Sequence, residues 1–111
     1  MHYATLISSR LEGADLQDAL LIGSNLEHAY VRAAHLQRAR LDEARLMRAD
    51  FEGADLEGAF LRDANVVGTN FASANLKGVA LDDIRGANLE GVRLPKNVRF
   101  EDISSRKKSQ H

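Results

Sequence analysis

The sequence lacks the residues on which several classes of small protein depend. Its 111 residues include no cysteine and no tryptophan, and only one proline. Without cysteine the chain cannot build a disulfide framework or use thiolate chemistry, and its redox compartment stays open. Aromatic residues make up 5% of the chain although 44% of it is apolar. This shortage of rings argues against a conventional core filled by large aromatic side chains.

Charge of one sign and long apolar runs are also absent. The formal net charge is −1 at pH 7, so no overall attraction to nucleic acid or to an anionic membrane is expected. No window approaches the roughly 18 apolar residues that span a bilayer, and no secretory signal is visible at the N-terminus. The length allows one domain at most. We therefore expect a soluble cytoplasmic protein without a membrane span or direct nucleic-acid binding.

A large apolar residue recurs at every fifth position from residue 6 to residue 81, and a small residue usually stands two places before it. Five residues advance about 140° around an α-helix, so these side chains would cover every face. In a β-strand they would alternate between two faces. The pattern is explained if the chain turns a corner every five residues, so that each large side chain points to one axis. With two later leucines, the predicted core is Leu6, Leu11, Leu16, Leu21, Leu26, Val31, Leu36, Leu41, Leu46, Phe51, Leu56, Leu61, Val66, Phe71, Leu76, Leu81, Leu89 and Leu94.

Four corners close a coil of twenty residues, and successive coils stack at a strand spacing of about 4.8 Å. The narrow interior accounts for the small inward residues. The residue before each centre is often Asp or Asn, which bond their own backbone in turns. The residue two after the centre is often Gly, which tolerates positive φ. Stacking by twenties also places Phe51 and Phe71 in one column, where we expect their rings to pack together.

Units such as ADLQD, SNLEH, ADFEG, ADLEG and ANLKG resemble the A(D/N)LXX motif of the pentapeptide-repeat family. The resemblance covers residues 4–83 in one register and 87–94 in a shifted register. It implies an all-β fold, a right-handed quadrilateral β-helix. The length predicts about four complete coils, a partial fifth coil and a short C-terminal cap.

The repeat breaks after Leu81, and the register slips within residues 82–88. Either Ile84 serves as an inward centre or the segment bulges outward. We favour an inward Ile84, since this places Leu89 beneath Phe71 and Leu94 beneath Leu76. The β-helix is then expected to occupy residues 1–94. Because proline cannot donate to a ladder, residues 95–111 are interpreted as a cap and a polar basic tail whose end we expect to be disordered.

Few residues suggest chemistry. His28 and His35 are predicted to project from different faces of the second coil, so they should not converge on a metal or a nucleophile. The corner glycines recur with the repeat and do not form a phosphate loop, and a filled axis leaves no cleft for a substrate. We therefore expect no enzymatic activity, no metal and no cofactor.

The resemblance implies one specific partner, because some family members are acidic dimeric rods that imitate duplex DNA and bind DNA gyrase. This chain has about half the coils that such a rod needs, unless dimerisation doubles it. The column that contains Asp15, Asp18, Asp55 and Glu57 is interrupted by Arg38 and Lys77. DNA mimicry needs a continuous negative stripe. Five arginines between the second and third coils are interpreted as members of compensating ion pairs: Arg32, Arg38, Arg40, Arg45 and Arg48. A gyrase-directed dimer is therefore the alternative hypothesis.

The leading hypothesis is a non-enzymatic protein-interaction scaffold that acts through its flat walls on an unknown protein partner. A structural repeat segment of a larger assembly is a third hypothesis, and a homodimer through an end of the solenoid is possible because an uncapped end invites association. Some outward positions carry apolar residues where polar ones would be expected. The predicted interaction surface consists of Ile7, Leu20, Tyr30, Met47, Phe60 and Val67.

Overall fold

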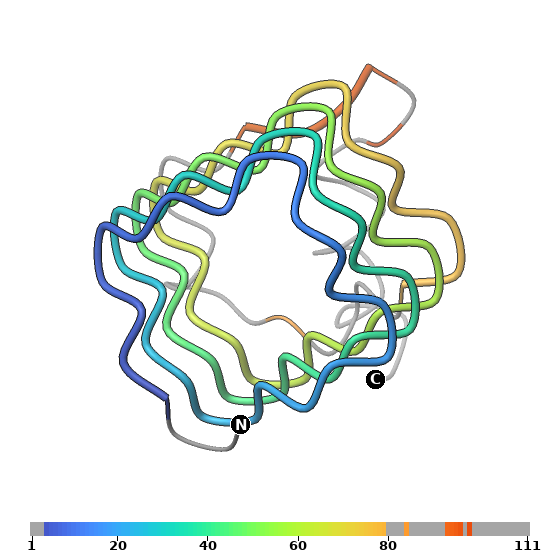
Figure 1. Ribbon diagram of the computed structural model, residues 1–111. Coiled ribbons are helices and arrows are strands. Elements are labelled where there is room, and N and C mark those ends of the chain that lie inside the picture. Colours follow the sequence, from blue (N-terminus) through green and yellow to red (C-terminus); the bar gives the residue numbers. More distant parts are fainter. Residues whose placement is uncertain (1–3, 80–83, 85–92, 97, 99–111) are drawn as a thin grey trace, which may run out of the picture.

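The computed structural model describes residues 4–79, 84, 93–96 and 98 (Figure 1). This part of the chain contains no helix and no extended strand, and its regular structure consists of isolated parallel β-bridges. From Thr5–Asn25 to Asp55–Asn75 these bridges join residues twenty positions apart. Figure 1 shows the result, four-sided coils stacked along one axis. The chain is therefore a β-solenoid, and we name its first three coils by residues 4–23, 24–43 and 44–63.

Each five-residue unit turns its corner at the same place. The residue two after each centre has a positive φ, and these corner positions comprise nine non-glycine residues and six glycines. The next amide donates to the carbonyl of the centre, as from Ala14 to Leu11 at 3.0 Å. If the centre is taken as the first residue of a four-residue turn, the residue with positive φ is the third. A positive φ there together with this hydrogen bond is typical of a type II turn. Glycine was predicted at such corners, but the fold also holds residues such as Ala33 and Glu43 in the left-handed region.

Side chains just before the centres support the same corners. In seven units the Oδ1 atom of Asp or Asn accepts a hydrogen bond from the backbone amide two residues later, at 2.9 to 3.2 Å. These bonds confirm the predicted turn chemistry. The residues are Asp15, Asn25, Asp50, Asp55, Asn65, Asn70 and Asn75.

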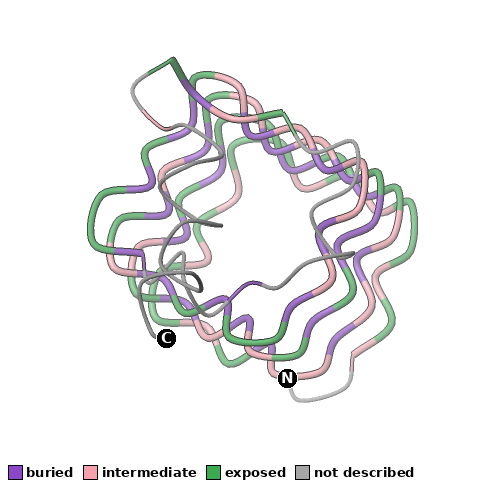
Figure 2. Cartoon of the chain, turned by 180° about the vertical axis from the view of Figure 1, so that it is seen from behind, coloured by how far each residue is buried: buried purple, intermediate pink, exposed green. Residues whose placement is uncertain are grey.

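Stacking buries the inward side chains from the second coil onward, and the buried positions form continuous bands along the walls (Figure 2). The rings of Phe51 and Phe71 pack at a centroid distance of 5.5 Å with a tilt of 43°, as predicted. Thr69 takes a small inward position, and its hydroxyl donates to the Leu46 carbonyl at 2.6 Å, which satisfies a buried polar group. Three inward leucines of the first coil, Leu6, Leu11 and Leu16, are only half-buried, whereas Leu21 at its end is fully buried. Leu81 and Leu89 lie outside the described residues.

The break in the repeat places the C-terminal segment differently from our expectation. Ile84 is 2% exposed, so it is inward. However, the Phe71 amide donates to the Arg93 carbonyl at 2.7 Å, and Arg93 bridges Asn70. In the regular coils each centre donates to the residue before the centre that covers it, so Leu94 continues the column of Phe71.

The expected placement of Leu89 beneath Phe71 and Leu94 beneath Leu76 is therefore wrong. The physical reason is an insertion: Leu94 follows Phe71 by 23 residues, three more than a regular coil contains. Beyond it, Pro95 is buried, and the Val98 amide donates to the Pro95 carbonyl at 3.1 Å. The remainder of the expected cap and tail lies outside the described residues. Among the residues that are described, no helix could cross a membrane.

Candidate functional site

The outward apolar residues do not form one patch. Ile7, Leu20, Tyr30 and Phe60 are exposed, each by 44% or more. Met47 is only 8% exposed, so its prediction as an outward contact residue is wrong. Met47 lies in the third coil, which has a described coil on each side, whereas Ile7 in the first coil has a described coil on one side only. Val67 in the same row is half-buried.

One wall carries Leu20, Arg40 and Phe60 in a single ladder, because consecutive bridges join these residues. The guanidinium carbon of Arg40 lies 4.3 Å from the centroid of the Phe60 ring. The same guanidinium donates to both carboxylate oxygens of Asp42, at 3.0 and 3.3 Å. These hydrogen bonds lower the pKa of Asp42 and raise the pKa of Arg40. The cation is thus held over the aromatic face, and we call Leu20, Arg40 and Phe60 the Phe60 ladder.

The opposite wall carries a similar but weaker arrangement. The guanidinium carbon of Arg10 lies 5.6 Å from the Tyr30 ring centroid. Two corners of each coil separate the row of Tyr30 from the row of Phe60, so the two rings face away from each other. The structure therefore separates the predicted contact residues over two opposite walls and one corner.

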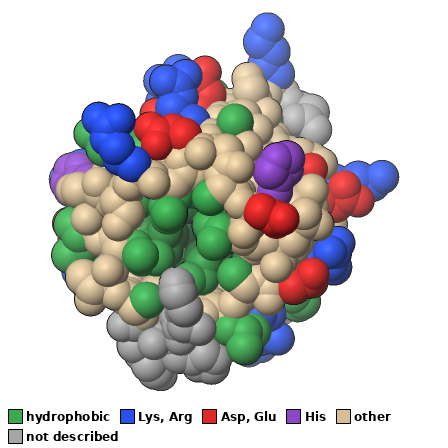
Figure 3. Space-filling view, viewed as in Figure 1, with side chains coloured by type: hydrophobic (Ala, Val, Ile, Leu, Met, Phe, Trp, Pro, Cys, Tyr) green, Lys and Arg blue, Asp and Glu red, His purple; other side chains and the backbone are tan. Residues whose placement is uncertain are grey.

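Ion pairs between neighbouring coils neutralise much of the charge on the walls. Arg38 donates to both carboxylate oxygens of Asp18 at 2.9 and 3.1 Å, which lowers the pKa of Asp18 and raises that of Arg38. Arg32 pairs with Glu52 at 3.0 Å and approaches Asp50 at 3.7 Å. Figure 3 shows acidic and basic side chains beside one another around the rim. The predicted compensation is thus confirmed for Arg32, Arg38 and Arg40, and opposite charges adjoin on the rows of Arg32 and Arg38.

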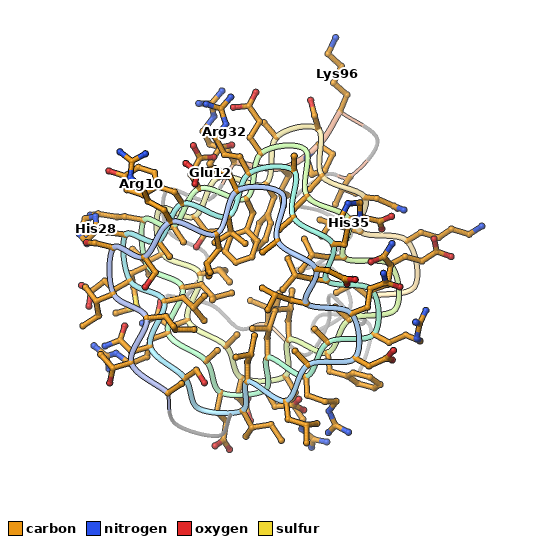
Figure 4. All side chains as sticks on the ribbon, viewed as in Figure 1. Arg10, Glu12, His28, Arg32, His35 and Lys96 are labelled. Carbon is orange, nitrogen blue, oxygen red and sulfur yellow. The ribbon has the colours of Figure 1, made fainter. Side chains whose placement is uncertain are left out.

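The described residues provide little for catalysis. His28 and His35 project from opposite sides of the coil (Figure 4). Among these residues no group of three His, Cys, Asp or Glu side chains could hold a metal ion. One groove of about 580 Å³ was not foreseen from the sequence, because it forms where residues 93–96 meet residues 72–74. Its lining consists of Ala72, Ser73, Ala74, Arg93, Leu94, Pro95 and Lys96. Lys96 points out into solvent, so the groove does not gather its charges around a common point (Figure 4).

Comparison with known proteins places this geometry in a family. A family model described as pentapeptide repeats matches in eight copies, over residues 1–38, 24–63 and 49–94. No curated protein matches the sequence. Among solved structures, a pentapeptide repeat protein from the thylakoid lumen of Arabidopsis thaliana is 26% identical, with 75% of this chain and 65% of that chain covered and a TM-score of 0.46.

A pentapeptide repeat protein from Nostoc PCC 7120 is 27% identical, with 88% of this chain and 79% of that chain covered and a TM-score of 0.45. HetL, a pentapeptide repeat protein involved in heterocyst differentiation regulation from the same cyanobacterium, is 29% identical, with coverage of 84% and 46% and a TM-score of 0.41. The chain thus spans less than two thirds of the Arabidopsis and HetL chains. Because these TM-scores are low, the assignment rests on the repeat match, which extends over most of the sequence. The chain belongs to the pentapeptide-repeat family.

Proposed function

We propose that this protein is a non-enzymatic interaction scaffold that binds a protein partner through the Phe60 ladder. The observation that carries the proposal is the exposure of Leu20 (49%) and Phe60 (44%) on either side of a cation fixed by Asp42. Aromatic residues and arginine are enriched where interfaces gain most of their binding energy. A side chain that is already held in place also loses less conformational entropy on binding.

The filled interior directs function to the walls. Apart from the buried Ser24, the inward columns of the second and third coils are buried leucine, alanine, valine and phenylalanine, which leaves the outward side chains as the variable part of the molecule. Our proposal keeps the finer expectations from the sequence, namely a right-handed solenoid of four complete coils and a partial fifth, a C-terminal cap and a cytoplasmic location.

A capture experiment with matched variants tests the proposal. Phe60→Ala removes the ring from the ladder, and Tyr30→Ala is its control, since both residues precede a centre, both are 44% exposed and both lie under an arginine. We expect proteins retained by the wild type to be retained by Tyr30→Ala and lost with Phe60→Ala, as measured by quantitative mass spectrometry. Retention that Phe60→Ala leaves unchanged would contradict the role of this wall.

The alternative of a gyrase-directed DNA mimic makes a different prediction. The pairs Arg38–Asp18 and Arg32–Glu52 place positive charge among the acidic rows, which supports a protein partner over imitation of a polyanion. A supercoiling assay separates the two hypotheses. Inhibition or protection of gyrase at micromolar protein would favour the mimic, and its absence would remove it. If the chain is instead a structural segment of a larger assembly, capture should return one stoichiometric complex that neither ring variant disturbs.

A further inference from the structure

The N-terminal edge of the first coil has a regular set of backbone groups to which no described residue is bonded. Within the stack, each residue before a centre bonds to the preceding coil through both groups: Tyr30 donates to Ser9 at 2.8 Å and accepts from Leu11 at 2.7 Å. The equivalent residues of the first coil are Thr5, Arg10, Asp15 and Leu20. No backbone hydrogen bond among the described residues uses the N–H or C=O of these four. They form an open sheet edge that runs around the coil.

This end of the molecule is also apolar. Leu6, Leu11 and Leu16 are half-buried here, whereas the leucines that stack on the last of them, Leu36 and Leu56, are fully buried. Figure 3 shows the hydrophobic side chains gathered at the centre of the end. Solenoids need their ends covered, because open edges and apolar ends promote association.

We propose that a second copy of the chain covers this end, related to the first by a two-fold axis that passes between Glu12 and Gly13. Around this axis residue n faces residue 25 − n of the second copy. Arg10 therefore faces Asp15 of the second copy, and Thr5 faces its Leu20. Leu20 belongs to both surfaces, but the inference does not use Arg40 or Phe60, which lie further along the side wall.

The pitch of the solenoid selects this axis. The edge of the first coil is a ramp that rises by one coil, about 4.8 Å, over twenty residues. A two-fold axis at the middle of this edge gives the second copy an edge with the same slope as the first. The reason is that the heights of residues n and 25 − n along the solenoid axis always have the same sum. The gap is then constant on all four sides. An axis through another corner, or through the middle of a wall, would leave a step of one coil on at least one side.

The charges select the same axis independently. Arg10 and Asp15 of one copy meet Asp15 and Arg10 of the other, which gives two pairs of opposite sign. Axes through the wall at residue 10 or at residue 15 would place like charges opposite each other. Two antiparallel residues that each have a free N–H and C=O exchange both hydrogen bonds, and their outward side chains lie about 5 Å apart at Cβ. The four residue pairs would thus exchange about eight hydrogen bonds.

The apolar surfaces are complementary as well. Each inward leucine faces a small inward residue of the second copy: Leu6 faces Ala19, Leu11 faces Ala14 and Leu16 faces Ser9. The two shorter dimensions of the molecule are 26 and 23 Å. A contact of this cross-section buries on the order of 600 Å² per copy, which reaches the lower end of the range for specific interfaces.

Charge reversal provides a test in solution. Arginine is tolerated before a centre at Arg40 and Arg45, so Asp15→Arg should fold. In sedimentation equilibrium we expect the wild type to dimerise, and Arg10→Glu and Asp15→Arg each to raise the dissociation constant about tenfold or more through like-charge pairs. A mixture of the two variants should form a heterodimer, because each then supplies the charge that the other needs, and the double variant should dimerise again. Arg45→Glu is the control, because Arg45 has the same position in its repeat unit but lies in the third coil, away from the edge. This variant should dimerise like the wild type.

A cross-link tests the position of the axis. The chain has no cysteine, so the double variant Thr5→Cys/Leu20→Cys contains only the introduced thiols. Paired residues of this kind lie about 5.5 Å apart at Cα, within the range for a disulfide. We expect rapid oxidation to a covalent dimer, and slow oxidation of Arg10→Cys/Leu20→Cys, whose positions the axis keeps apart. A monomeric wild type, equal cross-linking of both variants, or failure of the mixture to heterodimerise would each overturn the proposal.

Discussion

The first and third coils are built from the same repeating unit but differ in what covers them. Leu16 and Leu56 occupy one column, yet Leu16 is half-buried and Leu56 is fully buried. The Asp55 amide donates to the Ala34 carbonyl at 2.9 Å, whereas no backbone bond among the described residues uses the Asp15 amide. The five-residue unit therefore determines which way a side chain points. Stacking determines how much that side chain contributes to the stability of the fold. In a solenoid, stability is close to a sum of nearest-neighbour terms.

Replacing matched leucines by alanine should give the largest difference in stability between the first and third coils. Leu56→Ala leaves a cavity in a covered column and should lower the free energy of unfolding by about 2–5 kcal/mol. Leu16→Ala removes the same atoms from a half-buried site and should cost roughly half as much. Urea unfolding followed by circular dichroism measures both. Equal losses would show that burial within the stack does not control stability.

Substitution of two corner glycines by alanine should give a smaller difference in stability. Gly53→Ala and Gly68→Ala each place a side chain at a φ of about +70°, which costs about 1 kcal/mol. A Cβ at Gly53 meets nothing within 4 Å, but at Gly68 it would lie 3.1 Å from Cγ of Arg48. We therefore expect Gly68→Ala to have the lower thermal midpoint of the two. The reverse order would mean that the Arg48 side chain moves aside without cost.

The ion pair between the first and second coils should give the smallest effect. The hydrogen bonds from Arg38 lower the pKa of Asp18 in the folded chain. This contribution to stability is therefore present above the ordinary carboxyl pKa of about 3.9 and is lost as the pH falls through the lowered folded-state value. Asp18→Asn should be slightly less stable than the wild type at neutral pH and low salt, and equally stable in acid. Because the pair is exposed, high salt should also remove the difference. A difference that persists in acid would assign the effect to packing.

Much of this fold could be predicted from the sequence, because the same unit supplies the same information many times. The inward columns, the Phe51–Phe71 pair and the turn bonds of residues such as Asp50 all follow from position within the unit. The placement of Leu94 could not be predicted, because an irregular segment gives its length without showing which column it rejoins.

The candidate site was less predictable. Position within the unit indicates that Met47 points outward, but its burial depends on the neighbouring rows. The shared row of Arg40 and Phe60 could be read from the sequence. The stacking of the guanidinium on the ring depends on a side-chain conformation that Asp42 fixes, and a periodic pattern does not encode that conformation.

Residue-resolved amide hydrogen exchange tests most directly whether protection comes from stacking. The amides of Tyr30 and His35 bond to the first coil at 2.8 Å, so they should exchange slowly in both the wild type and Arg10→Glu. The amides of Arg10 and Asp15 should exchange rapidly in Arg10→Glu and in dilute wild type. At high wild-type concentration, where a second copy covers the edge, their exchange should slow. Fast exchange at Tyr30 and His35, or exchange at Arg10 and Asp15 that does not change with concentration, would contradict this account.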